Sequence, residues 1–369
     1  MTSVSEALAR AAEFVTTAPV LKAEPFGSGH VNATFRLTDE QGRRYLLQLI
    51  SRHAFPRPDQ VMANVRRVTQ ELAAAVPDPR RRLTLVPTRA GAWWLDAAGE
   101  CWRVYQFIEN STELPAPLTV GEVEAGGRAL GEFLVQVAQI PAGDLFVTIE
   151  GFHDEPRYVA RLRHAAERDV AGRAGAVRDE IERALSYEAV SHDVDDTAMP
   201  QRVTHNDAKM ANILFDAATH EPLCVVDLDT VQPGLAVQDF GDGIRSGAAT
   251  AAEDDPDVAA VSLSLPLFEG FARGYLGACG DLLEPAEIAH LRHGARLAAL
   301  ETSLRFLTDY LAGDVYFRID HPTHNLDRAR NQLALLADID RHWDELGRIV
   351  DRIGRDLGLT RETGRPGRI

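Results

Sequence analysis

The sequence predicts an α+β chain with a small β-rich N-terminal lobe and a large helical C-terminal lobe. Its 369 residues exceed the ~250–300 residues that one hydrophobic core usually supports. Short alternating apolar runs broken by glycine occupy much of the first 108 residues, whereas alternations of alanine, leucine and charge dominate the rest. The composition changes at the polar segment Glu109-Asn110-Ser111-Thr112. We therefore expect the lobes to span residues 1–108 and 109–369.

The N-terminal lobe is predicted from two kinds of apolar spacing. Apolar residues three or four apart indicate helices, and apolar residues two apart indicate strands. The clearest helix contains Val61, Val65, Val68 and Leu72 on one face. In chain order, the predicted elements are a helix over 4–16, a strand, glycine turn and strand within 23–37, a strand over 44–50, a helix over 58–75, and strands over 83–86, 92–96 and 101–108.

The C-terminal lobe is predicted to be mainly helical. Helices are expected over 120–139, 155–170 and 176–190, where apolar residues recur every three or four positions. Two or three further helices are expected between residue 262 and the C-terminus. A polar motif separates the two groups of helices.

The composition argues against some classes of binding partner and favours one cellular compartment. The net charge of −16 argues against nucleic acid and anionic membranes as partners. No run of about 20 apolar residues is present, and the N-terminus lacks the apolar core of a signal peptide. Cys101, Cys224 and Cys279 lie far apart, which favours reduced core thiols over disulfides or a zinc site. We expect a cytoplasmic protein, either a monomer or a homodimer.

The motif between the helices has the spacing of a phosphoryl-transfer site. It runs from Val203 to Asn212 and is followed by an apolar run that ends in Asp227-Leu228-Asp229. In the kinase pattern H-R-D-x-x-x-x-N the asparagine follows the aspartate by five residues, as Asn212 follows Asp207. A lone His-x-Asp is more often a helix cap or a loop hydrogen bond. The ordered set of loop, asparagine and Asp-x-Asp favours a kinase-type site that uses ATP and Mg²⁺.

Each polar residue of the motif has an expected role. Asp207 is the predicted base, which orients a substrate hydroxyl and accepts its proton. Asn212 and Asp227 offer the hard oxygen ligands that Mg²⁺ prefers. Asp229 is either a second metal ligand or a structural acceptor. Lys209 is expected to neutralise charge on the transferred phosphoryl group, and a solvated loop lysine is the alternative.

The nucleotide is expected to bind the N-terminal lobe. A glycine turn between two strands lets backbone N–H groups approach phosphates, although an ordinary hairpin turn has the same pattern. At the junction of the lobes, an extended segment with apolar side chains can flank an adenine ring, although a plain interlobe strand would look alike. The predicted nucleotide-binding residues are Gly27, Ser28, Gly29, His30, Asn32, Gln48, Gln106, Phe107 and Ile108.

Gln48 departs from the general kinase pattern. The strand 44–50 places glutamine where the pattern V-A-I-K has a phosphate-contacting lysine. An amide donates a hydrogen bond but brings no positive charge. Either Mg²⁺ carries more of the phosphate charge, or another cation such as Lys209 or Arg305 reaches the site.

Two residues beyond the motif, Arg305 and Tyr316, also stand out. Arg305 is flanked by apolar residues on a predicted helix, and a buried arginine is costly unless it is paired. It therefore meets a carboxylate, which is the commoner case, or faces a pocket. Tyr316 can be a core aromatic with a satisfied hydroxyl.

Taken together, these motifs resemble the aminoglycoside phosphotransferase/choline kinase superfamily and, within it, the N-acetylhexosamine 1-kinases. The resemblance extends from about residue 20 to about residue 345. The stretches that carry it are Gly29–Asn32, Trp102–Tyr105, Arg202–Asp207, Asp227–Thr230, Pro233–Gly234, Asp239–Asp242, Ile244–Arg245, Arg305–Leu307, Asp309–Leu311 and Tyr316–Phe317.

The resemblance implies a bilobal protein-kinase-like fold and a specific reaction. It implies ATP- and Mg²⁺-dependent phosphorylation of the anomeric hydroxyl of N-acetylglucosamine or N-acetylgalactosamine, which yields the α-1-phosphate. It also implies that Asp207 is the base, that Asn212 and Asp227 serve the metal, and that Arg305 and Tyr316 contact the sugar.

Two alternatives to this reaction remain open at the level of sequence. One is a kinase for another small hydroxyl substrate, such as another hexose, an aminoglycoside, choline or a homoserine-like compound. The acidic balance of the chain would suit a cationic substrate. The other alternative is a nucleotide-binding pseudokinase, which only Gln48 supports.

Overall fold

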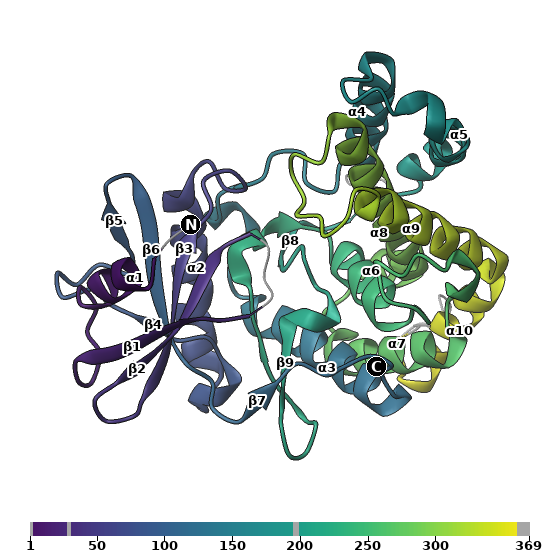
Figure 1. Ribbon diagram of the computed structural model, residues 1–369. Helices are drawn as coiled ribbons and strands as arrows, with labels where there is room; N and C mark the ends of the chain where they lie inside the picture. Colours follow the sequence, from purple (N-terminus) through teal and green to yellow (C-terminus); the bar gives the residue numbers. More distant parts are fainter. Residues whose placement is uncertain (1–2, 28–30, 195–198, 360–369) are drawn as a thin grey trace, which may run out of the picture.

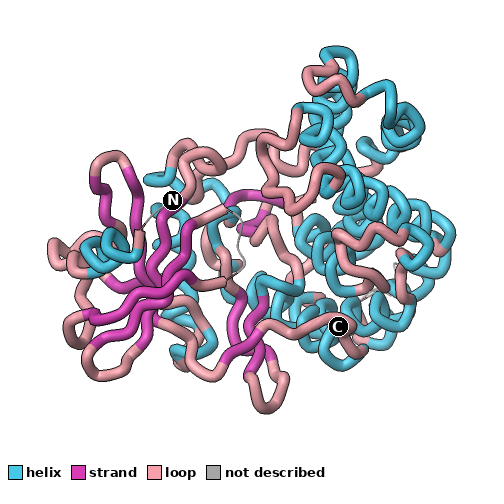
Figure 2. Tube along the Cα trace, in the orientation of Figure 1, coloured by secondary structure: helices cyan, strands magenta, loops and turns pink. Residues whose placement is uncertain are grey.

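A computed structural model describes residues 3–27, 31–194 and 199–359 of the chain (Figure 1). Strands gather in the N-terminal region and helices in the C-terminal region, as the colouring by secondary structure makes plain (Figure 2). This arrangement confirms the predicted α+β class. The short strands that carry the polar motif lie between the two regions (Figure 1).

The N-terminal sheet is antiparallel, and its strands follow the order β1-β2-β3-β6-β4, with β5 also paired to β6. Alternate residues of β2 and β3 point to one face, where Leu37 and Leu47 are buried. The strands are β1 (Val20–Pro25), β2 (Ala33–Asp39), β3 (Arg44–Ile50), β4 (Leu85–Val86), β5 (Leu95–Ala97) and β6 (Glu100–Gln106).

Two helices accompany this sheet. Helix α1 (Val4–Ala11) is capped by the Ser3 hydroxyl and buries Ala7 in the same apolar cluster as Leu37. It ends five residues before the predicted position. Helix α2 (Pro58–Ala75) begins with proline, which suits the first helical turn, and it buries its apolar face in the larger core. Its bounds match the predicted ones.

Short strands join the two regions. Strand β7 (Ser111–Thr112) pairs with β9 (Ile213–Asp216), which also pairs with β10 (Pro222–Val225). Strand β8 (Arg202–Thr204) pairs with β11 (Gln232–Gly234). The chain thus begins to pair with the C-terminal region soon after β6 ends. The division at residue 108 stays a prediction.

The C-terminal region is built from packed helices. The 28-residue helix α8 packs against α4, α6 and α9, and α3 packs along α7. The chain order is α3 (Val120–Val137), α4 (Glu155–Arg168), α5 (Arg178–Ser186), α6 (Ala236–Gly247), α7 (Leu265–Cys279), α8 (Pro285–Ala312), α9 (His324–Arg341) and α10 (Trp343–Asp356). After residue 262 the described chain forms four helices, where two or three were expected.

Helix α6 was not predicted, because its sequence is rich in glycine. Glycine disfavours helices by about 0.5–1 kcal/mol relative to alanine. Packing against α8 requires it here, since a Cβ on Gly241 would lie 2.1 Å from the carbonyl oxygen of Gly294. A Cβ on Gly243 would likewise lie 2.1 Å from the Phe271 ring. Close helix packing therefore overrides local propensity.

The cysteines and the apolar character of the helices were both addressed by the composition. Cys101, Cys224 and Cys279 are buried and unpaired, as expected for core thiols. Among the described helices, none combines the length and apolar character needed to cross a bilayer.

Candidate active site

The motif forms a loop between β8 and β9, here called the 205–212 loop. Helix α6 holds its start, because the backbone N–H groups of His205 and Asn206 donate to the two carboxylate oxygens of Asp239 at 2.8 and 2.7 Å. Asp239 is buried, so this pairing satisfies a charge that would otherwise be costly. The sequence offered Asp239 only as part of a family-like stretch, without a role.

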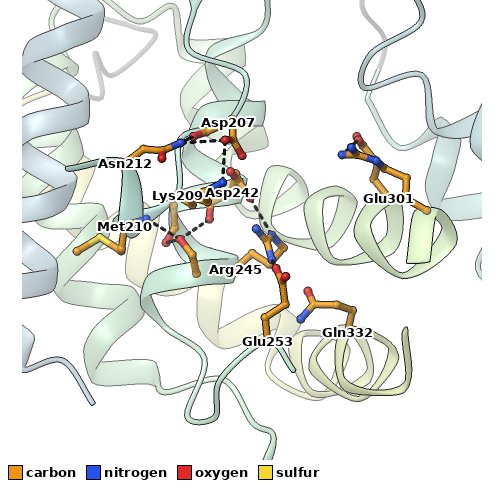
Figure 3. A network of polar contacts seen from close by, with 12 residues as sticks. Asp207, Lys209, Met210, Asn212, Asp242, Arg245, Glu253, Glu301 and Gln332 are labelled. Atoms are coloured by element: carbon orange, nitrogen blue, oxygen red, sulfur yellow. Dashed lines mark hydrogen bonds and ion pairs between the residues drawn. The ribbon is translucent and has the colours of Figure 1, made fainter. Parts of the chain in front are cut away.

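Helix α6 also supports the end of the 205–212 loop (Figure 3). The Met210 N–H donates to the Ser246 hydroxyl at 3.0 Å, and that hydroxyl donates to the backbone oxygen of Asp242 at 2.8 Å. Asp242 in turn pairs with Arg245 at 2.8 Å, and Arg245 also pairs with Glu253. The 205–212 loop is therefore bonded to α6, and the polar side chains of α6 at this point have partners of their own.

Asn206 fixes the backbone of the loop. Its φ of 62° is left-handed, a conformation that asparagine adopts more readily than most residues. Its side-chain nitrogen donates to the backbone oxygens of Thr204, Thr230 and Gln232 at 3.2, 3.1 and 3.2 Å. These bonds tie β8 to the chain that follows Asp227.

His205 helps to set the position of Asp207, two residues later. Its Nδ1 accepts a hydrogen bond from the Asp207 N–H at 3.3 Å, so its proton lies on Nε2. Nε2 donates to the Val226 carbonyl at 2.8 Å. The fully buried imidazole thereby joins the 205–212 loop to the strand end that precedes Asp227.

The Asp207 carboxylate is held on one oxygen (Figure 3). Lys209 Nζ and Asn212 Nδ2 both lie 2.9 Å from Asp207 Oδ2. Burial opposes ionisation of Asp207, but the charge and hydrogen bond of Lys209 and the hydrogen bond of Asn212 outweigh it, so the pKa of Asp207 lies below its usual range. Within the described chain, Oδ1 has no protein donor, so it is free to accept a hydrogen bond.

Asp227 and Asn212 present oxygen atoms without protein partners among the described residues. Asp227 has a left-handed φ of 63°, and its side chain is open to solvent. Displacement of bulk water by the surrounding protein, together with the charges of Asp229 and Asp207, raises the pKa of Asp227 to about 6. Asn212 directs its amide nitrogen to Asp207, which leaves its amide oxygen unused.

This pair of oxygen donors suits a hard divalent cation. Mg²⁺ is commonly held by one or two protein oxygens, with water and substrate phosphates completing its shell. Across residues 3–27, 31–194 and 199–359, no group of three or more His, Cys, Asp or Glu side chains could hold a metal. The two oxygen donors of Asn212 and Asp227 suit a metal whose remaining ligands are water and phosphate oxygens.

Asp229 already has protein partners on both oxygens. Its Oδ1 forms an ion pair with Arg103, and its Oδ2 accepts a hydrogen bond from Asn32 Nδ2 at 2.6 Å. Arg103 and Asp229 are only 1% and 2% exposed. Of the two roles expected for Asp229, these contacts support the structural acceptor.

Gln48 faces Arg103 on the neighbouring strand. Gln48 Oε1 accepts hydrogen bonds from Arg103 Nε at 3.0 Å and Nη2 at 2.8 Å. Lys209 and Arg305, the substitute cations considered from the sequence, pair with Asp207 and Glu301, and their role toward phosphate stays a prediction. The sequence did not reveal the contact with Arg103, which follows from the strand register.

The predicted nucleotide-binding residues are only partly described. Gly27 ends the described chain after β1 with a φ of 80°, while Ser28, Gly29 and His30 lie outside the described residues. Asn32 uses its side chain on Asp229 and on the Ser51 N–H, which donates to it at 2.9 Å. The role of this turn in nucleotide binding stays a prediction.

The junction segment follows β6. Gln106 is exposed, Ile108 is buried, and the Phe107 ring meets Phe26 edge to face at 5.5 Å. The Phe107 N–H donates a hydrogen bond to the Arg44 carbonyl oxygen at 3.2 Å. Its adenine-flanking role also stays a prediction.

Arg305 projects from α8 and forms an ion pair with Glu301. Its Nη1 lies 3.2 Å from Glu301 Oε1, and its guanidinium lies 5.5 Å from the Phe152 ring and 5.6 Å from the Phe317 ring. The predicted pairing is therefore present, yet the Arg305 side chain remains 27% exposed. Tyr316, beside Phe317, is 48% exposed.

A histidine that the sequence did not single out links Arg305 to the 205–212 loop. His153 Nδ1 lies 2.7 Å from Glu301 Oε2, and its Nε2 lies 3.2 Å from the Asn206 carbonyl. Both partners only accept hydrogen bonds, so the ring is an imidazolium. Burial opposes this charge, but Glu301 outweighs burial and raises the pKa of His153 to about 9.

Arg305 also lies within electrostatic range of Asp207. Burial lowers the pKa of Arg305, but the charges of Glu301 and, more weakly, of Asp207 raise it overall. The structure thus brings Asp207, Lys209, Asn212, Asp227 and Arg305 to one site, and adds His153 and Glu301 to it.

A family model described as the phosphotransferase enzyme family matches residues 22–279. A microcompartment-associated aminopropanol kinase has a similar structure, with a TM-score of 0.61 and 17% identity over 93% of this chain and 98% of that chain. An amicoumacin kinase solved with AMP-PNP, Ca²⁺ and Ami has a TM-score of 0.57 and 14% identity, over 89% and 92% of the two chains.

An ethanolamine kinase from Plasmodium vivax is also similar. Its TM-score is 0.51 and its identity 12%, over 84% of this chain and 82% of that chain. At these identities the likeness concerns the fold. The predicted kinase-like, aminoglycoside phosphotransferase-like fold is confirmed.

Proposed function

The chain belongs to the phosphotransferase enzyme family, and from this premise we propose that it is an ATP-dependent N-acetylhexosamine 1-kinase. It would transfer the γ-phosphoryl group to the anomeric hydroxyl of N-acetylglucosamine or N-acetylgalactosamine and give the α-1-phosphate. The observation that carries the phosphoryl-transfer assignment is the Asp207 carboxylate, which is held on Oδ2 by Lys209 and Asn212 while Oδ1 stays open.

Asp207 acts as the base in this proposal. Its lowered pKa keeps it ionised, so Oδ1 accepts a hydrogen bond from the sugar hydroxyl and orients the oxygen toward the γ-phosphorus. The new O–P bond forms as the bond from the γ-phosphorus to the bridging oxygen of ADP breaks. The hydroxyl proton passes to Asp207 late in this loose transition state. Lys209 offsets negative charge beside the reacting oxygens.

Asn212 and Asp227 would hold Mg²⁺. Bound there, the ion would neutralise charge on the nucleotide phosphates. The open position of Asp227 and the unused amide oxygen of Asn212 support this assignment. We further propose that residues 1–108 bind the nucleotide and residues 109–369 carry the base and the sugar.

The charges on the acceptor side favour a neutral substrate over an amine. Glu301 is shared between Arg305 and the His153 imidazolium, and the Arg305 guanidinium stays 27% exposed on this side. A cationic substrate would be repelled there, whereas sugar hydroxyls can accept hydrogen bonds from a guanidinium. The exposed Tyr316 ring adds an apolar surface for a pyranose.

An amino-alcohol kinase is the second candidate. The net charge of −16 suits a cationic substrate, and two of the similar structures are described as aminopropanol and ethanolamine kinases. The two candidates differ in the charge that the acceptor site must tolerate.

Steady-state turnover on a panel of acceptors separates the candidates. The panel contains N-acetylglucosamine, N-acetylgalactosamine, glucose, galactose, aminopropanol, ethanolamine, choline and an aminoglycoside, each with ATP and Mg²⁺. We expect turnover on the N-acetylhexosamines and a ³¹P signal of an anomeric phosphate. Turnover confined to the amines would replace the sugar proposal, and no turnover on any acceptor would leave a nucleotide-binding pseudokinase.

A further inference from the structure

We propose that Arg103 is a positioning residue that anchors the metal-binding turn to the N-terminal sheet through Asp229. The turn in question spans residues 227–230 and is called the 227–230 turn below. The inference rests on the proposed function, because its consequence is the affinity for a metal–nucleotide complex. It assigns a task to Arg103, which stands on β6 opposite Gln48, the residue at the position of the absent strand lysine.

The orientation of Arg103 is fixed from its own sheet. Its strand β6 pairs with β3 so that Arg103 stands opposite Gln48, and a single glutamine oxygen receives the Arg103 Nε and Nη2 groups at 3.0 and 2.8 Å. The Tyr105 ring lies 5.1 Å from the guanidinium. Gln48 therefore orients the Arg103 side chain by accepting two of its hydrogen bonds.

The Arg103 guanidinium contacts the C-terminal region through the carboxylate of Asp229. Arg103 Nη1 donates to Asp229 Oδ1, and the pair is almost fully buried. Asn32 Nδ2 donates to the other oxygen of Asp229 at 2.6 Å, and the Ser51 N–H holds Asn32 in place. Both oxygens of Asp229 are thus bound by side chains of the N-terminal region, two residues after Asp227.

A third contact supports the same segment from α2. The Asn64 amide nitrogen donates to the Val231 carbonyl at 3.0 Å and to the Phe146 carbonyl at 2.8 Å. Asp229 and Val231 are therefore both bonded to the N-terminal region, while Thr230 between them bonds to His205 and Asn206. Asp227 lies at the start of this turn, two residues before Asp229.

Arg103 is placed for anchoring, because it cannot contact a ligand in this structure. Its side chain is 1% exposed, and its Nε, Nη1 and Nη2 groups all have protein acceptors. Replacing a buried ion pair by neutral groups often leaves stability unchanged, whereas removing one partner alone is costly. A double variant can therefore separate the stability of the fold from the placement of Asp227.

The test compares Arg103→Met, Asp229→Asn and the double variant with the unmodified protein. Calorimetry measures the affinity for AMP-PNP with Mg²⁺ and, separately, for AMP-PNP with EDTA. Loss of a group that orients a metal ligand typically weakens metal affinity by about 10–100-fold. We expect a loss of that size with Mg²⁺ in all three variants and little change with EDTA. Arg67→Met, which removes an arginine that pairs with Glu71 along α2 and is 37% exposed, is the matched control.

The double variant decides between positioning and a purely structural role. We expect it to recover most of the melting temperature lost in Arg103→Met, but not the Mg²⁺-dependent affinity. Full recovery of both would overturn the proposal. Unchanged or tighter Mg²⁺–AMP-PNP binding in Arg103→Met would also overturn it, because a freed Asp229 would then be a metal ligand.

Hydrogen exchange of the nucleotide-free protein gives a second readout. Amides of residues 226–232 should lose protection in Arg103→Met and in the double variant, while those of α9 keep theirs. Unchanged protection at 226–232 in both variants would refute the anchoring role. If the unmodified protein binds no Mg²⁺–AMP-PNP at all, the proposed function fails with it, and that outcome differs from a failure confined to the variants.

Discussion

Nδ1 of His153 lies 2.7 Å from Oε2 of Glu301, and this contact connects α8 to the loop that contains Asp207. The other ring nitrogen of His153 donates to the Asn206 carbonyl at 3.2 Å, so the imidazole is protonated in the folded protein. The substrate side of the site and the 205–212 loop are therefore held together by a titratable group.

This link makes stability depend on pH above neutrality. The pKa of His153 is raised to about 9 in the folded protein, against about 6.5 in an unfolded chain. Its contribution is fully present below about pH 6.5 and is lost as the pH rises through about 9. We expect the free energy of unfolding from urea titrations to fall between pH 7 and pH 9.5. His153→Gln should flatten this pH dependence, and an equally steep decline in the variant would contradict the assignment.

Asp207→Asn tests the base. The amide cannot accept the hydroxyl proton, so we expect kcat to fall by about 10²–10⁴-fold, the usual contribution of a positioned acid or base. Binding of Mg²⁺–AMP-PNP should remain, because Asn212 and Asp227 are intact. Calorimetry and a coupled ADP assay measure the two quantities. Turnover equal to that of the unmodified enzyme would remove Asp207 from its role.

Gln48→Lys restores the general kinase pattern, and we expect it to harm the protein. A lysine at this position would face the buried Arg103 guanidinium without a free carboxylate, at a cost on the order of 3 kcal/mol. Gln48→Met is the matched control, because it removes the same hydrogen bonds without adding charge. Thermal unfolding should rank Gln48→Lys below Gln48→Met. Higher turnover in Gln48→Lys would instead support the pseudokinase alternative.

Arg305→Met tests the acceptor side. Loss of hydrogen bonds from a charged group should raise KM for the N-acetylhexosamine about 10–100-fold, with KM for ATP nearly unchanged. If the amine reading is right, the same variant should improve turnover of aminopropanol, since a repelling cation has been removed. Parallel kinetics on both acceptors distinguish the two outcomes.

Gly241→Ala tests the packing of α6 against α8. A Cβ there would lie 2.1 Å from the Gly294 carbonyl oxygen, so we expect a loss of about 1–3 kcal/mol in unfolding free energy and reduced turnover, because α6 holds the 205–212 loop. Gly277→Ala in α7 is the control, since a Cβ at Gly277 has open space around it. That change should raise stability by about 0.5–1 kcal/mol. Equal melting temperatures in the two variants would refute the packing argument.

Local periodicity predicted the strongest elements well. Strand β3 and helix α2 have the predicted bounds, because Val61, Val65 and Val68 repeat with a helical period and β3 lies between turn signals. The spacing of Asp207 and Asn212 singled out two residues that lie together, since a short loop can close a hydrogen bond between residues five apart.

The remaining features depend on contacts between distant parts of the chain. Gly241 belongs to a helix only because α8 approaches it closely, which no local window reveals. Arg103 and Asp229 are 126 residues apart, and His153 and Glu301 are 148 residues apart. These pairs follow from strand register and helix packing. Arg305 could therefore be singled out from the sequence, whereas His153, which pairs with the same glutamate, could not.

The three enclosed cysteines have a practical consequence for experiments on this protein. Burial raises the pKa of both Cys101 and Cys279 to about 12, and it raises the pKa of Cys224 as well, so almost no reactive thiolate exists near pH 7. A cysteine engineered onto each region would then be the preferred target of maleimide dyes. Fluorescence distance measurements can follow movement between the two regions without first removing the native thiols.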